Sequence, residues 1–370
     1  MSGHRRQSGP SRETPLEKRL KEQIKRNGPI SVGAYMTACL TDPEHGYYVR
    51  RQAIGAEGDF ITAPEMSQVF GELIGLWAAA VWMQLGSPAP FNLVELGPGR
   101  GTLLCDALRA ARVVPGFLRA LALHLVESSR ALRSRQALAL EAFGMNPRWH
   151  DEPATLPEGA AVVIANEFLD ALPVEQIVFE DGRWQWRKVG LDEDDRLAFC
   201  PGGSASLTPP LDPSAPVEPG AVYELRDVSG LLDELAGSRG GASLAMLIID
   251  YGHTDTLMGD TLQGVRGHTY VSPFEAPGET DLTTQVDFLA VAAAARCCAL
   301  SVDGPLAQAE FLGRLGIVER ASKLMSANPS KAGEIEAGVA RLMAPAGMGT
   351  RFKVLGVRSS DLPPLPGFET

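Results

Sequence analysis

The sequence lacks an apolar run long enough to cross a membrane. Its two most apolar stretches, residues 73–85 and 288–300, are interrupted by Gln84 and Arg296, and both are shorter than the roughly 20 residues that a membrane-spanning helix needs. We therefore expect no membrane insertion. The N-terminus also lacks the apolar core of a secretory signal, so we expect a protein that is not secreted and a disordered tail over residues 1–14.

Cysteines are few, and none has the spacing of a metal site. The five cysteines include no Cys-x-x-Cys pair and no Cys/His ligand pattern, so we predict no bound metal. An odd number of cysteines also disfavours a disulfide framework and favours a reducing compartment. Neighbouring Cys297 and Cys298 lie in an alanine-rich segment that predicts a helix, where we expect them to serve in packing.

Basic residues are outnumbered by acidic ones. The chain has 34 Lys and Arg against 45 Asp and Glu, which gives a formal net charge of −11. This balance disfavours a broad phosphate-binding surface, and therefore a nucleic-acid substrate. A cationic partner would suit the surface better.

A short apolar segment at residues 91–96 runs directly into a turn that contains Gly97, Gly99 and Gly101. This pattern predicts a buried strand that ends at a ligand-binding crevice, where glycines let backbone N–H groups approach the ligand. A dinucleotide-binding motif requires Gly-x-Gly-x-x-Gly, whereas Thr102 stands where its third glycine would be. The spacing therefore disfavours an NAD-dependent dehydrogenase.

Glu95 stands two residues before the first glycine of this turn. A carboxylate here attracts cations and repels a pyrophosphate, which favours S-adenosylmethionine, because that cofactor carries an ammonium and a sulfonium and no phosphate. A second apolar segment, residues 122–127, ends in Glu127, which is placed to accept both ribose hydroxyls. Two alternatives stay open: an ordinary glycine-rich turn at the first place, and an acidic helix N-terminus near Ser129 at the second.

Helical periodicity dominates the N-terminal quarter of the chain. Residues 15–40 have the apolar spacing of two helices separated by a Gly-Pro pair. A further helix with a long apolar stripe is expected after Thr62, which has capping-box spacing with Glu65. We interpret residues 15–90 as an N-terminal helical cap.

The remainder of the chain alternates strands with helices, which predicts a mainly parallel sheet and an α/β fold of the Rossmann-like kind over residues 91–357. The predicted strands cover residues 92–96, 122–127, 161–166, 244–250 and 351–357.

Two insertions are expected in this domain. The first covers about 175–240, with a hairpin near residue 181 and a loop from 200 to 220 that is rich in Pro, Gly and Ser. The second covers about 255–345 and ends in helices. Residues 358–370 are expected to form a tail.

Polar residues follow two further strands. Asn166, Glu167 and Asp170 come after one apolar segment, and Asp250 and Tyr251 come at the end of another. Because ligands bind at the carboxyl ends of parallel strands, we expect these residues at the rim of an active site. A capped helix N-terminus is the alternative for the first group, and a simple turn for the second.

Four motifs occur in the order that a known family shows: GDFITAPE at residues 58–65, ELGPGRG at 95–101, NEFLDALP at 166–173 and IDYG at 249–252. On these motifs the chain resembles the MidA-like methyltransferases, and the resemblance extends over residues 15–357. That family includes the mitochondrial complex I assembly factor that symmetrically dimethylates an arginine of the 49-kDa subunit.

The resemblance implies a class I methyltransferase fold and S-adenosylmethionine as the cofactor, with the loop at residues 58–65 closing over it. Together with the glycine turn, it provides a set of candidate cofactor-binding residues: Asp59, Thr62, Pro64, Glu95, Gly97, Gly99, Gly101 and Glu127.

The resemblance also implies a protein-arginine substrate, in a 49-kDa-type subunit of respiratory complex I (NADH-quinone oxidoreductase) during assembly. A guanidinium stays protonated at pH 7 and is held best by carboxylates. The expected reaction is an in-line displacement, aided chiefly by alignment and by carboxylates around the attacking nitrogen. The catalytic candidates are Glu167, Asp170 and Asn166, and the substrate-binding candidates are Glu65, Glu72, Asp250 and Tyr251.

Two other functions stay open: a methyltransferase that acts on a small molecule, and a non-catalytic assembly chaperone that retains the fold. The charge balance disfavours an RNA methyltransferase. The resemblance implies a cytoplasmic location if the chain is bacterial and the mitochondrial matrix if it is eukaryotic. Neither the oligomeric state nor the number of methyl groups transferred follows from the sequence.

Overall fold

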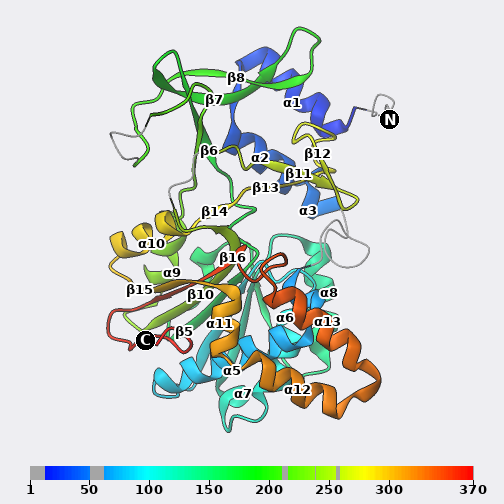
Figure 1. Ribbon diagram of the computed structural model, residues 1–370, viewed down its shortest axis with the longest axis vertical. Helices are drawn as coiled ribbons and strands as arrows, with labels where there is room; N and C mark the ends of the chain where they lie inside the picture. Colours follow the sequence, from blue (N-terminus) through cyan, green and yellow to red (C-terminus); the bar gives the residue numbers. More distant parts are fainter. Residues whose placement is uncertain (1–12, 51–61, 211–215, 238, 256–258, 370) are drawn as a thin grey trace. The chain divides into compact units, whose positions relative to one another are not determined.

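The computed structural model describes residues 13–50, 62–210, 216–237, 239–255 and 259–369. The chain divides into two compact units, each assembled from separate segments (Figure 1). The first unit comprises Met1–Ala53, Leu172–Leu225 and Met258–Thr284, and the second comprises Ile54–Ala171, Arg226–Leu257 and Gln285–Thr370.

The second unit is built on a mainly parallel sheet with the strand order β15-β16-β10-β5-β2-β3-β4. Five neighbouring strands are parallel: β2 (Phe91–Leu96), β3 (Leu121–Val126), β4 (Arg148–His150), β5 (Ala161–Asn166) and β10 (Leu244–His253). β16 (Phe352–Arg358) pairs antiparallel with both β10 and β15 (Ser301–Ala307), and β14 (Val286–Asp287) pairs with the end of β10. Every residue of β2 and β5 is buried, as expected for strands covered on both faces.

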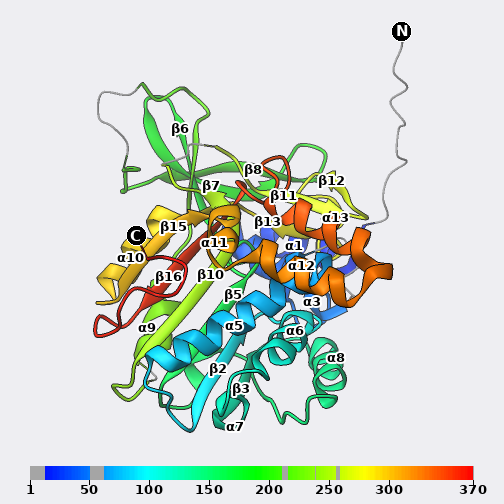
Figure 2. The same ribbon diagram turned by 60° about the horizontal axis from the view of Figure 1, so that its bottom comes forward.

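Helices cover both faces of this sheet. On one face, alternate residues of the strands share a hydrophobic core with α5 (Gln68–Gln84), α6 (Thr102–Ala111), α11 (Gln308–Arg314) and α12 (Ile317–Ala327). Figure 2 shows α5 running along this face. Strand periodicity directs Val94, Val163 and Ile248 to the opposite face, and α10 (Phe288–Cys297) contacts the neighbouring strands β10, β15 and β16. The remaining helices of this unit are α4 (Ala63–Met66), α7 (Phe117–Ala120), α8 (Arg130–Glu141), α9 (Ser229–Gly237) and α13 (Ala332–Met343), with short 3-10 turns at Pro153–Thr155 and Pro329–Lys331.

The helix expected after Thr62 differs from its sequence-based description in two ways. It is interrupted at Ser67, whose backbone is extended, so α4 and α5 are separate helices. The capping box does not form, because the Thr62 side chain makes no capping hydrogen bond and Glu65 accepts one from Thr102 instead. α5 also belongs to the second unit and not with the N-terminal helices, because its apolar stripe packs against α6 and the sheet.

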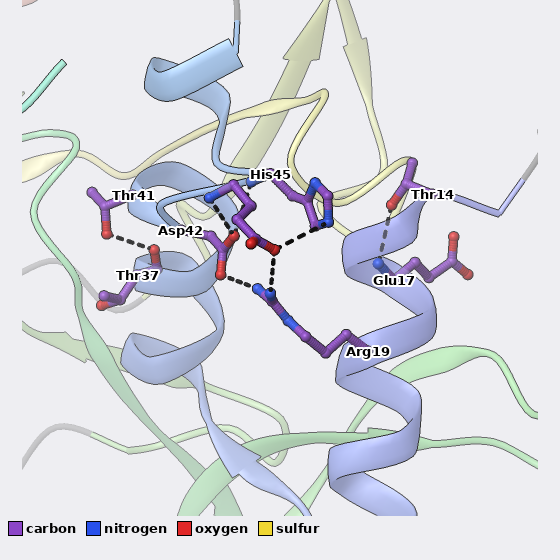
Figure 3. Close-up of polar contacts among 8 residues, drawn as sticks. Thr14, Glu17, Arg19, Thr37, Thr41, Asp42 and His45 are labelled. Carbon is purple, nitrogen blue, oxygen red and sulfur yellow. Dashed lines mark hydrogen bonds and ion pairs between the residues drawn. The ribbon is translucent and has the colours of Figure 1, made fainter. Parts of the chain in front are cut away.

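The first unit begins with the two expected helices, α1 (Pro15–Asn27) and α2 (Val32–Thr41), followed by α3 (Tyr47–Arg50). The Thr14 hydroxyl caps α1 by accepting a hydrogen bond from the Glu17 N–H at 3.0 Å. Figure 3 shows Arg19 of α1 reaching toward Asp42 in the turn after α2, with which it forms an ion pair. Arg19 is 44% exposed, so this pair fixes the turn more than it adds stability.

A sheet with the order β1-β7-β6-β9, in which β8 also pairs with β7, completes most of the first unit. The predicted hairpin is confirmed: Glu180 pairs with Arg183, and both Asp181 and Gly182 have positive φ, as a tight turn requires. Part of the expected 200–220 loop is strand β8. The bounds are β1 (Ile30–Ser31), β6 (Glu175–Glu180), β7 (Arg183–Leu191), β8 (Leu197–Ser204) and β9 (Val222–Leu225).

Two other elements were not expected from the sequence. Within the second insertion, β11 (Gln263–Arg266), β12 (Thr269–Val271) and β13 (Asp281–Thr283) form a three-stranded antiparallel sheet. These strands are too short for clear alternation. β15 was also missed, because its Gly304 and Pro305 interrupt a strand pattern and coincide with a bulge.

The C-terminal segment is packed and is not a free tail. Leu362, Leu365 and Phe368 are buried in the core of the second unit. Arg358 forms an ion pair with Asp303 at 2.9 Å, and the Leu365 N–H donates to the same carboxylate at 2.9 Å.

The described part of the chain contains no helix with the length and apolarity needed to span a membrane.

Candidate functional site

A cleft opens at the carboxyl edge of the parallel sheet, beside the point where the strand order reverses. The chain passes from β2 outward to β3 and β4, and then returns to the other side of β2 as β5. Leu96 pairs with Ala165, so the residues after these two strands are neighbours. Such a reversal leaves a crevice that commonly binds ligands. Glu95 and residues of three segments line the cleft: Thr62, Pro64 and Glu65; Gly97, Pro98, Gly99, Arg100, Thr102 and Leu103; and Asn166 and Glu167. The candidate Gly101 lies in the same turn but is not among the lining residues.

The glycine turn has the backbone conformation that the sequence pattern predicted. Gly97, Gly99 and Gly101 all have positive φ, at 63°, 53° and 82°, a region that other residues rarely adopt. A Cβ on Gly97 would also lie 2.9 Å from the ring of Phe168. The turn therefore needs glycine for its conformation and for space.

Glu95 is a buried carboxylate with an unused acceptor. Its side chain is 3% exposed, and its Oε2 has no hydrogen-bond partner among the described residues. Burial raises the pKa of Glu95 to about 8. Since burying an unpaired charge is costly, a cationic ligand group would provide the partner that the protein does not.

Glu127 and Gln136 connect the second strand end to the glycine turn. Glu127 accepts hydrogen bonds from the Ser129 N–H at 2.8 Å and from Gln136 at 3.2 Å. Burial raises the pKa of Glu127. Gln136, which is fully buried in α8, also donates to the Gly99 carbonyl at 2.7 Å and accepts from Trp149 at 2.8 Å. Sequence reasoning missed Gln136, because nothing distinguishes a glutamine within a helix from a surface residue.

The alternative for Glu127, an acidic helix N-terminus, is also present in the structure. Ser129 caps α8, and its N–H is held by the Glu127 carboxylate. Each carboxylate oxygen has a second lone pair, so this contact leaves acceptor capacity for a ribose.

Glu167 lines the cleft in a strained backbone conformation. Its φ is +50°, in the left-handed region that non-glycine residues seldom adopt. Its Oε1 accepts hydrogen bonds from the Ala63 N–H at 2.9 Å and from the Asn166 amide at 3.3 Å. No described residue donates to Oε2. Burial raises the pKa of Glu167 to about 7, so both the protonated and the ionised carboxyl are populated near neutral pH.

Asn166 also lines the cleft, and it is 8% exposed. Its Nδ2 donates to Glu167, whereas its Oδ1 has no hydrogen-bond partner among the described residues. The amide orientation is consistent with this bond, because a reversed amide would set two acceptors against each other.

Asp170, Asp250 and Tyr251 do not line the cleft. The fully buried carboxylate of Asp250 accepts from three backbone N–H groups, those of Leu169, Asp170 and Tyr251, at 3.0, 3.1 and 2.9 Å. Asp250 therefore holds the turn that follows β5. Burial raises the pKa of both Asp170 and Asp250, and the nearby Arg226 guanidinium opposes this rise.

Of the two substrate-binding candidates Glu65 and Glu72, only Glu65 lines the cleft. Glu65 lines the cleft and accepts a hydrogen bond from Thr102 at 2.6 Å. Glu72 does not line it: this residue is 1% exposed and is engaged by Arg320 at 2.6 Å and Gln68 at 2.8 Å. Asp59 lies outside the described residues.

The cleft residues fit S-adenosylmethionine. Glu95 Oε2, which has no partner among the described residues, offers a buried acceptor for a ligand cation, and the turn that follows it has positive φ at Gly97, Gly99 and Gly101. Glu127 follows the neighbouring strand β3 and is not among the described residues that line the cleft. The bound cofactor would supply an activated methyl group on its sulfonium.

Comparisons with known proteins agree with this fit. Residues 73–306 match the family model of S-adenosyl-L-methionine-dependent methyltransferases. The protein arginine methyltransferase NDUFAF7 homolog, mitochondrial, of Drosophila melanogaster is 37% identical over 92% of this chain and 84% of its own length. Protein arginine methyltransferase NDUFAF7, mitochondrial, of Homo sapiens is 36% identical over 92% of this chain and 82% of its own length.

A solved structure from Burkholderia thailandensis, bound to S-adenosyl-homocysteine, has the same fold. It superposes with a TM-score of 0.83 and 26% identity, over 95% of this chain and 94% of that one. The α/β fold and the cofactor inferred from the four motifs are therefore confirmed, and this chain belongs to the family of S-adenosyl-L-methionine-dependent methyltransferases.

Proposed function

We propose that this enzyme transfers methyl groups from S-adenosylmethionine to an arginine side chain of a protein. The observation that carries the proposal is Glu167, a half-buried carboxylate that lines the cofactor cleft and whose Oε2 accepts no hydrogen bond from any described residue. A guanidinium requires such an acceptor, because its N–H groups lose their hydration when it enters a cleft. The names of the relatives, which call them protein arginine methyltransferases, support the same acceptor.

Glu167 would orient the attacking nitrogen. Its Oε1 is fixed by the Ala63 N–H and by Asn166, which leaves Oε2 to accept from the guanidinium. A cation beside Glu167 lowers its pKa below the value of about 7 that burial alone produces, so the carboxylate is ionised when arginine binds. The nitrogen becomes more acidic as it gains the methyl group, and Glu167 would take the proton.

Asn166 and Asp170 would act by positioning. Asn166 holds the Glu167 carboxylate, whereas Asp170 lies in the buried group around Asp250 that shapes the turn after β5. Asp250 and Tyr251 would act indirectly, by holding the turn after β5, and would not contact the substrate themselves. We further propose that the acceptor is a 49-kDa-type subunit of respiratory complex I, methylated where that complex is assembled: the cytoplasm of a bacterium or the mitochondrial matrix of a eukaryote.

The test is methyl transfer from labelled S-adenosylmethionine to the purified complex I subunit, followed by analysis of methylated arginine. Glu167→Gln should reduce the rate by about 100-fold or more, since general acid–base and orienting groups contribute on that scale. Cofactor affinity should change by less than about threefold. Glu152→Gln, an exposed carboxylate of the same unit, is the matched control and should retain full activity. Undiminished transfer by Glu167→Gln would refute the role of Glu167, and label in small molecules alone would refute the protein acceptor.

A further inference from the structure

The cleft contains a single basic side chain among the described residues that line it. Three carboxylates, Glu65, Glu95 and Glu167, face one guanidinium, that of Arg100 in the glycine turn. Arg100 is 42% exposed, and its NH1 lies 3.8 Å from Glu65 Oε2, beyond hydrogen-bond distance. No other polar contact of Arg100 is found in the described part of the chain.

Glu65 is held more firmly by a different residue. Its Oε1 accepts a hydrogen bond from the Thr102 hydroxyl at 2.6 Å. The contact between Arg100 and Glu65 is therefore a loose Coulomb contact between a half-exposed cation and an anion that is already anchored. Such a pair contributes little to stability, and Arg100 can exchange Glu65 for another anion at small cost.

The cofactor brings one anion into this acidic cleft. The amino-acid end of S-adenosylmethionine is a zwitterion, with an ammonium and a carboxylate on the same carbon. The orphan Oε2 of Glu95 suits the ammonium. The carboxylate needs a cation, because the other carboxylates that line the cleft would otherwise repel it. Arginine suits a carboxylate best, since its planar N–H groups match the two oxygens.

We propose that Arg100 binds the carboxylate of the cofactor and gives up its contact with Glu65 when it does so. Arg100 then selects ligands with an intact amino-acid end. The proposal rests on the use of S-adenosylmethionine by this cleft, and it adds a specificity-determining residue to the cofactor site.

The test is calorimetric titration of the full chain with two ligands: S-adenosylhomocysteine and its decarboxylated analogue, which retains the amine. The wild type should bind S-adenosylhomocysteine more tightly by roughly 10- to 100-fold, the range of one charge-assisted contact. Arg100→Met should lower the affinity for S-adenosylhomocysteine by a similar factor and change the affinity for the decarboxylated analogue by less than about threefold. The affinity of Arg100→Lys for S-adenosylhomocysteine should fall between those of the wild type and Arg100→Met, because lysine keeps the charge but lacks the planar N–H groups of arginine.

Arg109→Met is the matched control. Arg109 is 43% exposed on the following helix, pairs with Asp106 at 2.5 Å, and does not line the cleft. Removing the charge of Arg109 should change the affinity for neither ligand. Equal weakening of both ligands by Arg100→Met, or no preference for the carboxylate in the wild type, would overturn the proposal and leave the cofactor site standing. A wild type that binds neither ligand would overturn the cofactor site as well.

Discussion

The charge of one side chain, Glu95, determines how the cofactor cleft responds to pH. Burial raises its pKa to about 8, so the carboxyl carries a proton at pH 7 in the free enzyme. An ammonium beside it stabilises the ionised form and lowers the pKa. Cofactor binding at pH 7 should therefore release up to one proton from Glu95.

The release of a proton from Glu95 predicts how the affinity for the cofactor depends on pH. Affinity for S-adenosylhomocysteine should rise from pH 6 to about pH 8, by at most about tenfold per unit. At higher pH the affinity should fall again, once the amino group of the ligand loses its own proton. Calorimetry in two buffers of different ionisation enthalpy measures the released proton. Glu95→Gln should bind more weakly and release none. A wild type that releases no proton at pH 7 would show that Glu95 is already ionised.

Part of this residue-scale chemistry follows from the sequence. Glu95, Gly97 and Gly99 are identifiable because strand, acid and glycine lie within a few positions of one another. Whether a carboxylate has partners depends on residues far away in the chain. Glu72 illustrates this, because its partner Arg320 is 248 positions away.

At the scale of elements, α8 fixes the shape of the glycine turn through Gln136. Gln136→Leu keeps the volume and removes three hydrogen bonds, those to Gly99, Glu127 and Trp149. We expect a loss of about 2–4 kcal/mol in the free energy of unfolding, since buried polar groups lose their partners. Cofactor affinity should also fall, because the turn is no longer held.

Urea denaturation and calorimetric titration check this prediction. Leu138→Ala, at a 73% exposed position of the same helix, is the control and should alter neither quantity much. If Gln136→Leu lowered stability without weakening the cofactor, the connection between α8 and the turn would be purely structural.

The contact between α5 and α6 depends on glycine. A Cβ on Gly75 would lie 2.4 Å from the backbone of Ala107, so Gly75→Ala forces the two helices apart. We expect the free energy of unfolding to fall by about 1–3 kcal/mol, the usual cost of overpacking. Gly333→Ala is the contrasting variant: it is also helical, but nothing lies within 4 Å of its added Cβ. That substitution should stabilise by up to about 1 kcal/mol, and equal effects of the two in denaturation curves would contradict the packing argument.

Strong local signals were confirmed at one place in the chain and failed at another. The hairpin at Asp181 and Gly182 formed because a tight turn needs those two residue types. The capping box at Thr62 did not form, because Thr102 engages Glu65 in its place. A local pattern fails when a tertiary partner offers a better contact.

At the scale of the whole molecule, the C-terminal segment closes the core of the second unit. Leu365 is fully buried, and the Trp77 side chain donates to the Pro366 carbonyl at 3.0 Å. Leu365→Ala should lower the free energy of unfolding by about 2–5 kcal/mol, as for other buried leucines. Deletion of residues 360–370 should cost more, although no residue of the cleft is removed.

Urea denaturation followed by tryptophan fluorescence measures both effects, because Trp77 lies in the affected core. Val318→Ala, at a 65% exposed position, is the control. Normal stability after the deletion would mean that residues 360–370 are dispensable for the core.

The division of the chain into units is also decided at this scale. The first unit collects three separate segments, of which Leu172–Leu225 and Met258–Thr284 interrupt the second unit. The expected boundaries, a cap over 15–90 and one domain over 91–357, follow the order of the chain. Which segments share a core depends on contacts between distant residues.

The sequence alone determined the positions of β2, β3, β5, β10 and β16, the glycine turn, the acids at the strand ends and the family, because periodicity, turn chemistry and short motifs are local properties. Only the tertiary structure decided that Glu95 Oε2 has no partner among the described residues, that Glu72 is paired with Arg320, that Gln136 holds Gly99, and that the C-terminal segment is core. These outcomes depend on burial and on partners brought together by folding, and sequence spacing does not encode either.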